Sequence, residues 1–327
     1  MVWPEGSSHG GFMRCVQDMI NHIGLSVIIS AYNEEKNITD CIASVKFADE
    51  IIVIDNESTD KTAQIAKHTG AKVFTRKNNL MLNANKNFGF SKAANRWILN
   101  IDADERITPE LAKEITTVLS MSDEIQGYWI PRKNIIFGKW MIGEMWWPDY
   151  QLRLFRKGKG AFEEKHVHEY IKVTGETAKL EEPMLHQNYK TVSQFLIKMD
   201  TIYTENEASL LLASGKKVTW VDAIRFPAND FLKTFFAQKG YRDGLHGLVL
   251  SFLQAFYAEV VFAKVWEKQG FPEENSSSFL HNLNKEFKKL QKEFRYWLIT
   301  ALMNEVKNPL KRLRYRFLRK AVKNTGI

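Results

Sequence analysis

The chain lacks the short motifs that mark the commonest nucleotide and zinc sites. No Gly-x-Gly-x-x-Gly follows its first apolar run, which disfavours a dinucleotide site, and no Gly-x-x-x-x-Gly-Lys-Ser/Thr occurs, which disfavours a P-loop. Pairs of the Cys-x-x-Cys or His-Glu-x-x-His type are also missing, so a zinc site is not expected. A nucleotide site built from acidic residues and a different metal is still compatible with the sequence.

Cysteine is scarce, and the charge balance is positive. Two cysteines in 327 residues cannot form a disulfide framework, which fits a reducing compartment. The first residues lack a basic segment followed by an apolar core, so no secretory signal peptide is expected. Forty-six lysines and arginines against 38 acids give a net charge of +8, which suits an anionic partner such as a membrane or a phosphorylated glycan. No nucleic-acid-binding motif accompanies this charge, so nucleic acid is not an expected partner.

Strand-like and helix-like segments alternate over the first hundred residues. Such alternation predicts a parallel sheet with right-handed crossovers. The expected strands are 25–30, 50–55, 72–75 and 97–101. Three helices are expected: one that opens at 33–38, one that follows the cap at 58–60, and one at 82–94. Polar residues follow three of these strands, at 32–34, 55–56 and 102–104, so they should meet at one edge of the sheet, where open α/β sheets bind ligands.

The segment Trp97–Glu105 combines a buried strand with two carboxylates. Alternate side chains of a strand share a face, so Asp102 and Asp104 are expected to point the same way from its C-terminal end. Two converging carboxylates suit Mg²⁺ or Mn²⁺, which in turn holds a diphosphate. A solvated acidic turn is the plainer interpretation of the same spacing.

Four ordered motifs give the chain a family resemblance. Ser30-Ala-Tyr-Asn-Glu-Glu35, Ile54-Asp-Asn-Glu-Ser-Thr-Asp60, Asn85-Lys-Asn-Phe-Gly89 and Asp102-Ala-Asp104 resemble those of family 2 glycosyltransferases. The similarity continues through Trp147–Phe155 and Val167-His-Glu169, over residues 24 to 265, and is greatest to lipopolysaccharide core glucosyl- and heptosyl-type transferases. Many relatives have Asp-Asp-Gly-Ser where this chain has Asp55-Asn-Glu-Ser58.

The resemblance implies a GT-A fold and a nucleotide-diphospho-sugar donor, with a UDP-sugar favoured. Asp102 and Asp104 would bind Mg²⁺ or Mn²⁺, and His168 is a further candidate ligand because a histidine completes such sites in some relatives. Lys86 lies where relatives have a basic residue near the diphosphate, and Arg153, on one strand face with Gln151, could pair with a phosphate oxygen. The full set of expected nucleotide-sugar-binding residues is Ala31, Tyr32, Asn33, Glu34, Asp55, Lys86, Asp102, Ala103 and Arg153.

The acceptor side is expected in the middle of the chain. Trp140, Trp146 and Trp147 form either a wall on which sugar rings stack or a hydrophobic flap packed on the core. Inverting transfer requires a group that takes the proton of the acceptor hydroxyl. The resemblance places it near Asp149, with Glu169 as the alternative base. His186 is a weaker candidate of the same kind as His168.

The C-terminal third is predicted to be helical from about residue 191. The run without charged residues, 244–258, is shorter than the ~20 residues that span a bilayer. Residues 308–320 form a basic amphipathic helix, which is typical of a membrane-surface segment. A solvated helix or an oligomer contact, including a homo-oligomer, is the alternative.

The expected fold class is therefore α/β: a GT-A-like, mostly parallel sheet flanked by helices, with a C-terminal helical appendage. We expect an N-terminal tail at 1–22, a catalytic domain at 23–190 with its nucleotide-sugar part at 23–105 and its acceptor part at 106–190, and a helical region at 191–327. The expected activity is metal-dependent inverting transfer to a lipid-linked or lipopolysaccharide-type glycan at the cytoplasmic face of the inner membrane. The alternatives are a polyprenyl-phosphate sugar synthase and a catalytically inactive glycan-binding scaffold.

Overall fold

The computed structural model describes residues 24–78, 82–121, 124–164, 169–273 and 277–324. The chain divides into two compact units. The first comprises the residues up to Asn134 together with Asp149–Asn188, and the second comprises Ile135–Pro148 together with Tyr189–Ile327. The chain therefore passes between the units three times. Ile135–Pro148, which the sequence assigns to the acceptor part, clusters with the C-terminal helices.

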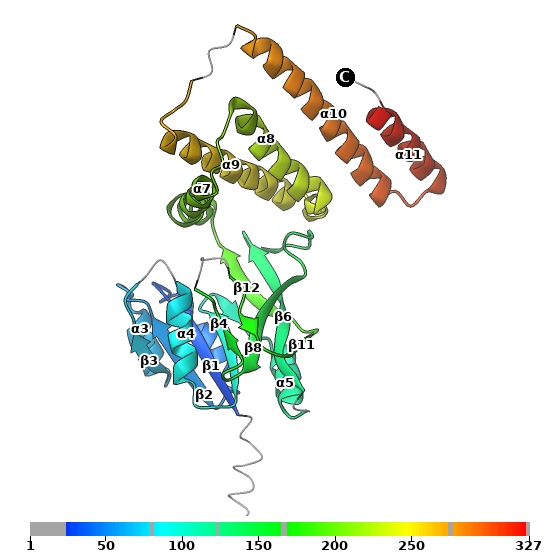
Figure 1. The fold of residues 1–327 in the computed structure, drawn as a ribbon. Helices are drawn as coiled ribbons and strands as arrows, with labels where there is room; N and C mark the ends of the chain where they lie inside the picture. Colours follow the sequence, from blue (N-terminus) through cyan, green and yellow to red (C-terminus); the bar gives the residue numbers. More distant parts are fainter. Residues whose placement is uncertain (1–23, 79–81, 122–123, 165–168, 274–276, 325–327) are drawn as a thin grey trace, which may run out of the picture. The chain divides into compact units, whose positions relative to one another are not determined.

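The first unit is built on one large sheet with a parallel half and a mixed half (Figure 1). Its strand order is β3-β2-β1-β4-β8-β6-β12-β5. The first four strands pair in parallel, whereas β8 runs antiparallel to both β4 and β6. The strands of this order are β1 (Leu25–Ala31), β2 (Glu50–Asp55), β3 (Lys72–Thr75), β4 (Trp97–Asp102), β5 (Glu105–Arg106), β6 (Ile125–Ile136), β8 (Asp149–Arg156) and β12 (Met184–Tyr189). Four short strands complete the set: β7 (Lys139–Trp140), β9 (Gly160–Ala161), β10 (Lys172–Val173) and β11 (Glu176–Lys179).

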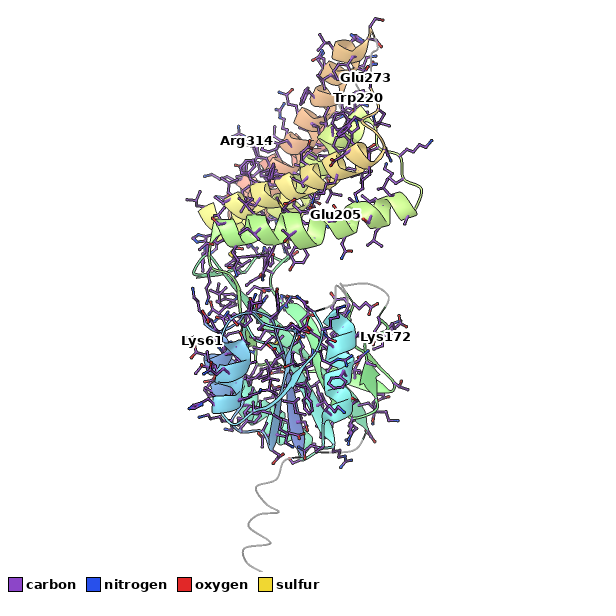
Figure 2. The ribbon with its side chains drawn as sticks, turned by 90° about the vertical axis from the view of Figure 1, so that its left-hand side faces the viewer. Lys61, Lys172, Glu205, Trp220, Glu273 and Arg314 are labelled. Carbon is purple, nitrogen blue, oxygen red and sulfur yellow. The ribbon has the colours of Figure 1, made fainter. Side chains whose placement is uncertain are left out.

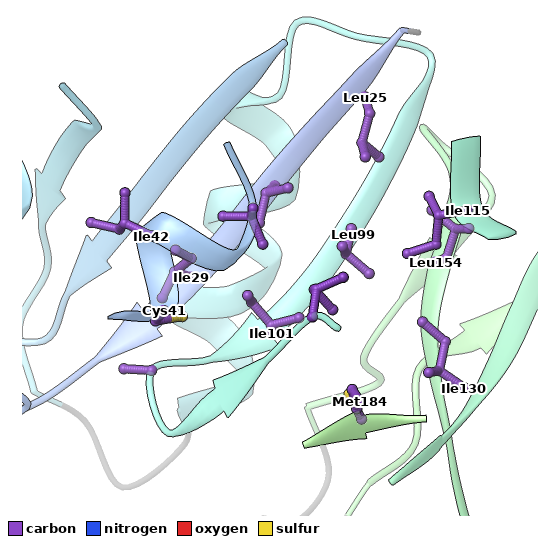
Figure 3. Close-up of a cluster of buried hydrophobic side chains, with 14 of the residues drawn as sticks. Leu25, Ile29, Cys41, Ile42, Leu99, Ile101, Ile115, Ile130, Leu154 and Met184 are labelled. Carbon is purple, nitrogen blue, oxygen red and sulfur yellow. The ribbon is translucent and has the colours of Figure 1, made fainter. Parts of the chain in front are cut away.

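Both faces of the central strands are covered, which is why their sequences are continuous apolar runs. On one face, Val27, Ile29, Leu99 and Ile101 belong to a core with residues of α2 (Ile38–Ser44), α3 (Thr62–His68) and α5 (Pro109–Leu119); Figure 3 shows part of this cluster. On the other face, Ile28, Ile52 and Ile54 pack with Phe90 of α4 (Leu82–Lys92).

Gly89 explains how α4 can lie so close to the sheet. A Cβ atom at this position would lie 2.6 Å from Ile28 Cγ2 and 2.9 Å from Ile54 Cγ1, well inside van der Waals contact. The glycine of the Asn85–Gly89 motif therefore has a packing role, because it lets α4 approach the sheet closely.

The second unit is helical. Its helices are α6 (Val192–Lys198), α7 (Thr204–Ala213), α8 (Trp220–Phe231), α9 (Leu245–Lys268), α10 (Phe279–Glu305) and α11 (Pro309–Asn324). The insertion between β6 and β8 is fastened to the turn before α9, because the buried Asp243 carboxylate accepts the backbone N–H groups of Ile142 (2.9 Å) and Gly143 (2.8 Å). By length and composition, α9 is one described helix that could cross a membrane, a test that the core helix of a soluble protein also passes.

The α/β fold class with a parallel sheet and a C-terminal helical appendage is confirmed. The first helix begins later than expected: α2 starts at Ile38, and Asn33 has a φ of 55°, so the expected helix opening at 33 is a turn with a left-handed residue. Asn33 is one of the residue types that tolerate this conformation. Asp104 also departs from expectation, because β4 ends at Asp102 and Asp104 lies on the turn to β5.

Candidate active site

The polar residues of the site gather where the parallel strands end. β1, β2 and β4 end at Ala31, Asp55 and Asp102, and the register pairs Ala31 with Asp55 and Ser30 with Asp102. Because β8 runs antiparallel to β4, its first residue, Asp149, lies at the same edge of the sheet as the end of β4.

The loop after β1 is locked to the segment after β2. Asn33 donates its backbone N–H to Ser58 Oγ (3.0 Å), and its Oδ1 accepts the backbone N–H of Thr59 (2.8 Å). The backbone N–H of Glu34 donates to Thr62 Oγ1 (2.7 Å). These bonds fix the backbone directly after Tyr32, whose side chain is exposed.

Asp55 presents a buried oxygen that has no hydrogen bond. Its carboxylate is 2% exposed, and Oδ2 accepts the backbone N–H of Ser58 at 3.4 Å. Among the described residues, Oδ1 has no donor. A buried acceptor without a donor costs free energy, so this oxygen is suited to receive a hydrogen bond from a ligand.

Asn56, beside Asp55, ties two strand ends to α4. Its Nδ2 donates to the carbonyl oxygen of Ala31 (2.9 Å), and its Oδ1 accepts from Asn85 Nδ2 (2.6 Å). Since α4 also carries Lys86, this bridge helps to set the position of that lysine.

Lys86 and Arg153 converge on Asp102. Lys86 Nζ lies 2.6 Å from Asp102 Oδ1, and Arg153 Nη2 lies 2.9 Å from Asp102 Oδ2. Burial alone would raise the pKa of this carboxyl, but the two cations hold its pKa well below the usual value. Asp102 is therefore ionised at neutral pH and holds two cationic groups at the edge of the sheet.

Glu105 connects the ion pairs of Asp102 to a second group of charged residues, which is centred on Arg132. Its carboxylate is fully buried, and Oε1 accepts from Arg153 Nη2 at 2.7 Å and from Arg132 Nη1 at 3.4 Å. Its Oε2 accepts the backbone N–H of Asp102 at 2.9 Å. Because this side chain reaches back to the end of β4, it also stabilises the turn that carries Asp104.

Asp149 lies at the other end of the same charged network. Its Oδ2 accepts from Arg132 Nη2 (2.6 Å) and Asn134 Nδ2 (3.1 Å), and its Oδ1 accepts from Gln151 Nε2 (2.6 Å). Burial would raise the pKa of Asp149, but the Arg132 guanidinium and these hydrogen bonds hold it below its usual value. The carboxylate is thus ionised and firmly oriented.

Strand alternation does not place Asp102 and Asp104 on one face, because Asp104 lies outside the strand, on the turn to β5. Its Oδ2 instead lies 3.5 Å from His186 Nε2, and β12, which carries His186, pairs with β5. Among the described residues, no group of three histidine, cysteine, aspartate or glutamate side chains converges as a metal site. A metal at Asp104 would therefore take further ligands from the diphosphate or water.

The hydrogen bonds around His186 determine which of its ring nitrogens carries the proton. Asn134 donates a hydrogen bond from Nδ2 to Asp149, so its Oδ1 faces His186 Nδ1 at 2.7 Å and accepts a hydrogen bond from it. In the neutral ring, Nε2 then presents a lone pair towards the Asp104 carboxylate. Two facing acceptors are complementary to a cation. The carboxylate oxygen suits both Mg²⁺ and Mn²⁺, and the imidazole nitrogen beside it fits Mn²⁺ better than Mg²⁺.

His168 and Glu169 were also predicted, as a metal ligand and as the alternative base. His168 lies outside the described residues. Glu169 is described: its Oε2 accepts the backbone N–H of Glu164 at 2.9 Å and lies 3.5 Å from Asn83 Nδ2 of α4.

The tryptophans of the 140s belong to the second unit. Trp146 packs with Ile136, Met141 and Leu250 in a small core. Trp140 and Trp147 contact each other edge to face, with their ring centroids 5.3 Å apart. Trp146 thus has the packing role of a flap, whereas the Trp140–Trp147 pair leaves aromatic surface exposed.

Sequence reasoning gave no role to Arg132, Glu105, Asn134 or Asn56. Glu105 and Asn56 adjoin residues that were singled out, so only their position beside a motif could have indicated them. Arg132 and Asn134 alternate on β6, and their role depends on the pairing of Arg132 with Asp149 across the sheet, which has no local sequence signal.

Comparisons with known proteins show which family the chain resembles. Residues 26–172 match the family model described as Glycosyl transferase family 2. The lipopolysaccharide core biosynthesis glycosyltransferase LpsC of Rhizobium meliloti is 29% identical over 256 residues, which cover 76% of this chain and 94% of LpsC. A glycosyltransferase of Rickettsia typhi is 32% identical over 256 residues, covering 74% of this chain and 87% of its own.

The comparison with solved structures gave a further match. Residues 1–349 of TarS from S. aureus have a TM-score of 0.41 and 18% sequence identity to this chain. The similarity covers 75% of this chain and 91% of that structure.

Proposed function

The chain belongs to glycosyl transferase family 2, and we propose that it is a metal-dependent, inverting enzyme that uses a nucleotide-diphospho-sugar. That the protein is a glycosyltransferase follows from its family. The proposed acceptor is a lipopolysaccharide-type or lipid-linked glycan, on the strength of the similarity to LpsC. The proposal includes a peripheral location on the cytoplasmic face of the inner membrane, where such an acceptor is anchored.

The observation that carries the proposal is the charged network at the strand ends. Lys86 and Arg153 supply cationic groups where a diphosphate would lie, and Asp102 keeps them in place. The unpartnered Asp55 Oδ1 is an acceptor for an N–H group of the nucleobase, such as N3–H of uracil in a UDP-sugar. The fixed backbone around Tyr32 provides a surface for the base or ribose.

Asp104 and His186 are the residues that we propose to hold the metal, with Asp102 close by. When bound, a divalent metal neutralises the charge that develops on the leaving diphosphate. Asn134 contributes by holding the His186 ring with Nε2 directed at Asp104. His186 replaces His168 as our preferred histidine, since the described residues bring it to Asp104.

Asp149 is the proposed base, with Glu169 as the alternative. An ionised carboxylate at the same edge of the sheet as Asp102 can take the proton of an acceptor hydroxyl as its oxygen attacks the anomeric carbon. Arg132 and Gln151 orient the Asp149 carboxylate, and Glu105 orients Arg132 in turn.

The test is donor hydrolysis by the purified protein. A panel of UDP-, GDP-, ADP- and dTDP-sugars is incubated with the wild type, Asp104→Ala and the matched surface control Asp40→Asn, with and without EDTA. We expect slow release of UDP by the wild type and the control, and its loss in EDTA and in Asp104→Ala. Turnover that is unaffected by EDTA would refute the metal, and the absence of both turnover and calorimetric nucleotide binding would favour the inactive scaffold.

A further inference from the structure

The helical hairpin formed by α10 and α11 accounts for all of the net positive charge of the protein (Figure 1). Residues 279–324 contain thirteen lysines and arginines and three glutamates, a net charge of +10. The whole chain has a net charge of +8, so the rest of the molecule is slightly acidic, at −2. Basic charge concentrated in this way on one hairpin indicates a surface that attracts an anionic partner.

The three glutamates of α10 are already neutralised. Glu286 and Glu293 both pair with Arg225 of α8, and Glu305 pairs with Arg242. In contrast, no acidic side chain in the described part of the chain pairs with any of the seven basic residues of α11. The positive charge of α11, which includes Arg314 (Figure 2), is therefore available to a ligand outside the protein.

One stripe of α11 is apolar and exposed. Leu310, Leu313 and Phe317, spaced i, i+3 and i+7, lie on one face of the helix and are 76%, 46% and 65% exposed. Val322, on another face, is buried. Arg316 and Lys320 are exposed and flank the apolar stripe. A helix that is held to its neighbour by one face thus presents apolar side chains next to cations on another.

A cavity of about 360 Å³ opens between the two helices. It is lined by Lys289, Lys292 and Lys323 together with the aromatic rings of Tyr296 and Trp297. A carboxylate, that of Glu293, also lines the cavity. Its Oε1 and Oε2 accept hydrogen bonds from Arg225 Nη1 at 2.9 and 2.8 Å. Lysines around amphipathic rings suit a phosphate group at the boundary between water and hydrocarbon.

We propose that the α10–α11 hairpin docks on an anionic phospholipid bilayer. Leu310, Leu313 and Phe317 enter the boundary between headgroups and acyl chains, the basic residues of α11 face the anionic headgroups, and the cavity receives a lipid phosphate. This surface deepens the peripheral location proposed above and would bring the enzyme to a lipid-anchored acceptor.

The charge and the apolar stripe together select this partner. A second copy of the chain would place one highly basic α11 against another, and like charges repel. A nucleic acid would satisfy the basic residues but would leave Leu310 and Phe317 exposed to water. A bilayer surface accommodates both features at once.

The experiment is vesicle flotation with the full chain, and it needs no donor, acceptor or turnover. Vesicles of phosphatidylcholine alone and of phosphatidylcholine with phosphatidylglycerol are compared for four proteins: the wild type, Arg316→Glu/Lys320→Glu, Leu310→Ser/Phe317→Ser and the control Lys67→Glu/Lys113→Glu. The control makes the same change in charge at exposed positions of the first unit. Circular dichroism checks that each variant is folded.

We expect binding only to the anionic vesicles, weakened by salt. Each basic residue near such a surface contributes about fivefold to the partition coefficient, so reversing two charges on α11 should lower it at least ~25-fold, and the control should leave it within about twofold. The serine variant should bind at least ~10-fold less, since an apolar contribution is lost.

Three results would overturn the proposal: equal binding to both kinds of vesicle, equal effects of the α11 and control variants, or wild-type binding by the serine variant. RNA binding that the serine variant retains, without vesicle binding, would assign the surface to nucleic acid. Because donor hydrolysis is measured separately, loss of vesicle binding with intact hydrolysis refutes only this inference.

Discussion

The active-site edge and helix α11 use charge in opposite ways. At the edge, six charged side chains form one alternating network. Lys86 pairs with Asp102, Asp102 and Glu105 share Arg153, and Glu105 and Asp149 share Arg132. On α11, seven charged side chains of one sign project without acidic partners in the described structure. Buried opposite charges fix the positions of side chains, whereas exposed like charges create a field. The first arrangement suits catalysis and the second suits attraction to a surface.

The largest effect is expected at the active-site edge, from the substitution Asp149→Asn. The amide keeps the size of the side chain but cannot take a proton, so we expect kcat to fall 10²- to 10⁴-fold while calorimetric binding of the donor nucleotide changes little. The matched variant Glu169→Gln tests the alternative base. If Asp149→Asn retains activity and Glu169→Gln does not, the roles are reversed. If neither matters, an acceptor that needs no base, such as a polyprenyl phosphate, is favoured.

Glu105→Ala tests whether the network is a structural unit. Removing this carboxylate leaves the buried Arg153 and the half-buried Arg132 without one of their partners, so we expect the free energy of unfolding to fall by about 3–5 kcal/mol. Urea denaturation followed by tryptophan fluorescence measures the loss. A change below about 1 kcal/mol would mean that the two arginines find other partners and that the network does not depend on its central carboxylate.

The network also predicts how stability depends on pH. Asp102 and Asp149 have folded-state pKa values below their ordinary, unfolded value, so their stabilising contribution is complete above that value and is lost as pH falls through the folded-state values. We expect the unfolding midpoint in urea to fall between pH 5 and pH 3, less steeply in Asp102→Asn than in the wild type. An equally steep decline in both proteins would show that Asp102 does not contribute.

The smallest effect is expected on α11. Arg316→Glu/Lys320→Glu removes no ion pair of the described structure, so it should change the free energy of unfolding by less than about 0.5 kcal/mol, in contrast to Glu105→Ala. The same urea denaturation gives this value. A loss comparable to that of Glu105→Ala would show that these residues stabilise the fold and would weaken the contrast between the two regions.

The sequence predicts the central strands β1, β2 and β4 well because they are buried on both faces and are therefore continuous apolar runs. It fails at Asp104, because the turn after β4 depends on Glu105 reaching back to the backbone of Asp102, a contact with no periodic signature. Lys86 and Arg153 converge on Asp102, and that both lie near the diphosphate is still a prediction. Asn134 and His186 come together only through the pairing of strands distant in sequence, which local patterns do not encode.

The three passages of the chain between the units have a consequence for engineering and for evolution. A chimaera that takes the first unit from a relative cannot be made with a single boundary near residue 189. Ile135–Pro148 would then come from the relative, although it belongs to the same unit as the C-terminal helices of this protein. The Asp243 carboxylate would then lose the two backbone N–H groups that it holds. We therefore expect functional chimaeras to require two transplanted segments, so that the 140s loop is inherited together with the helices.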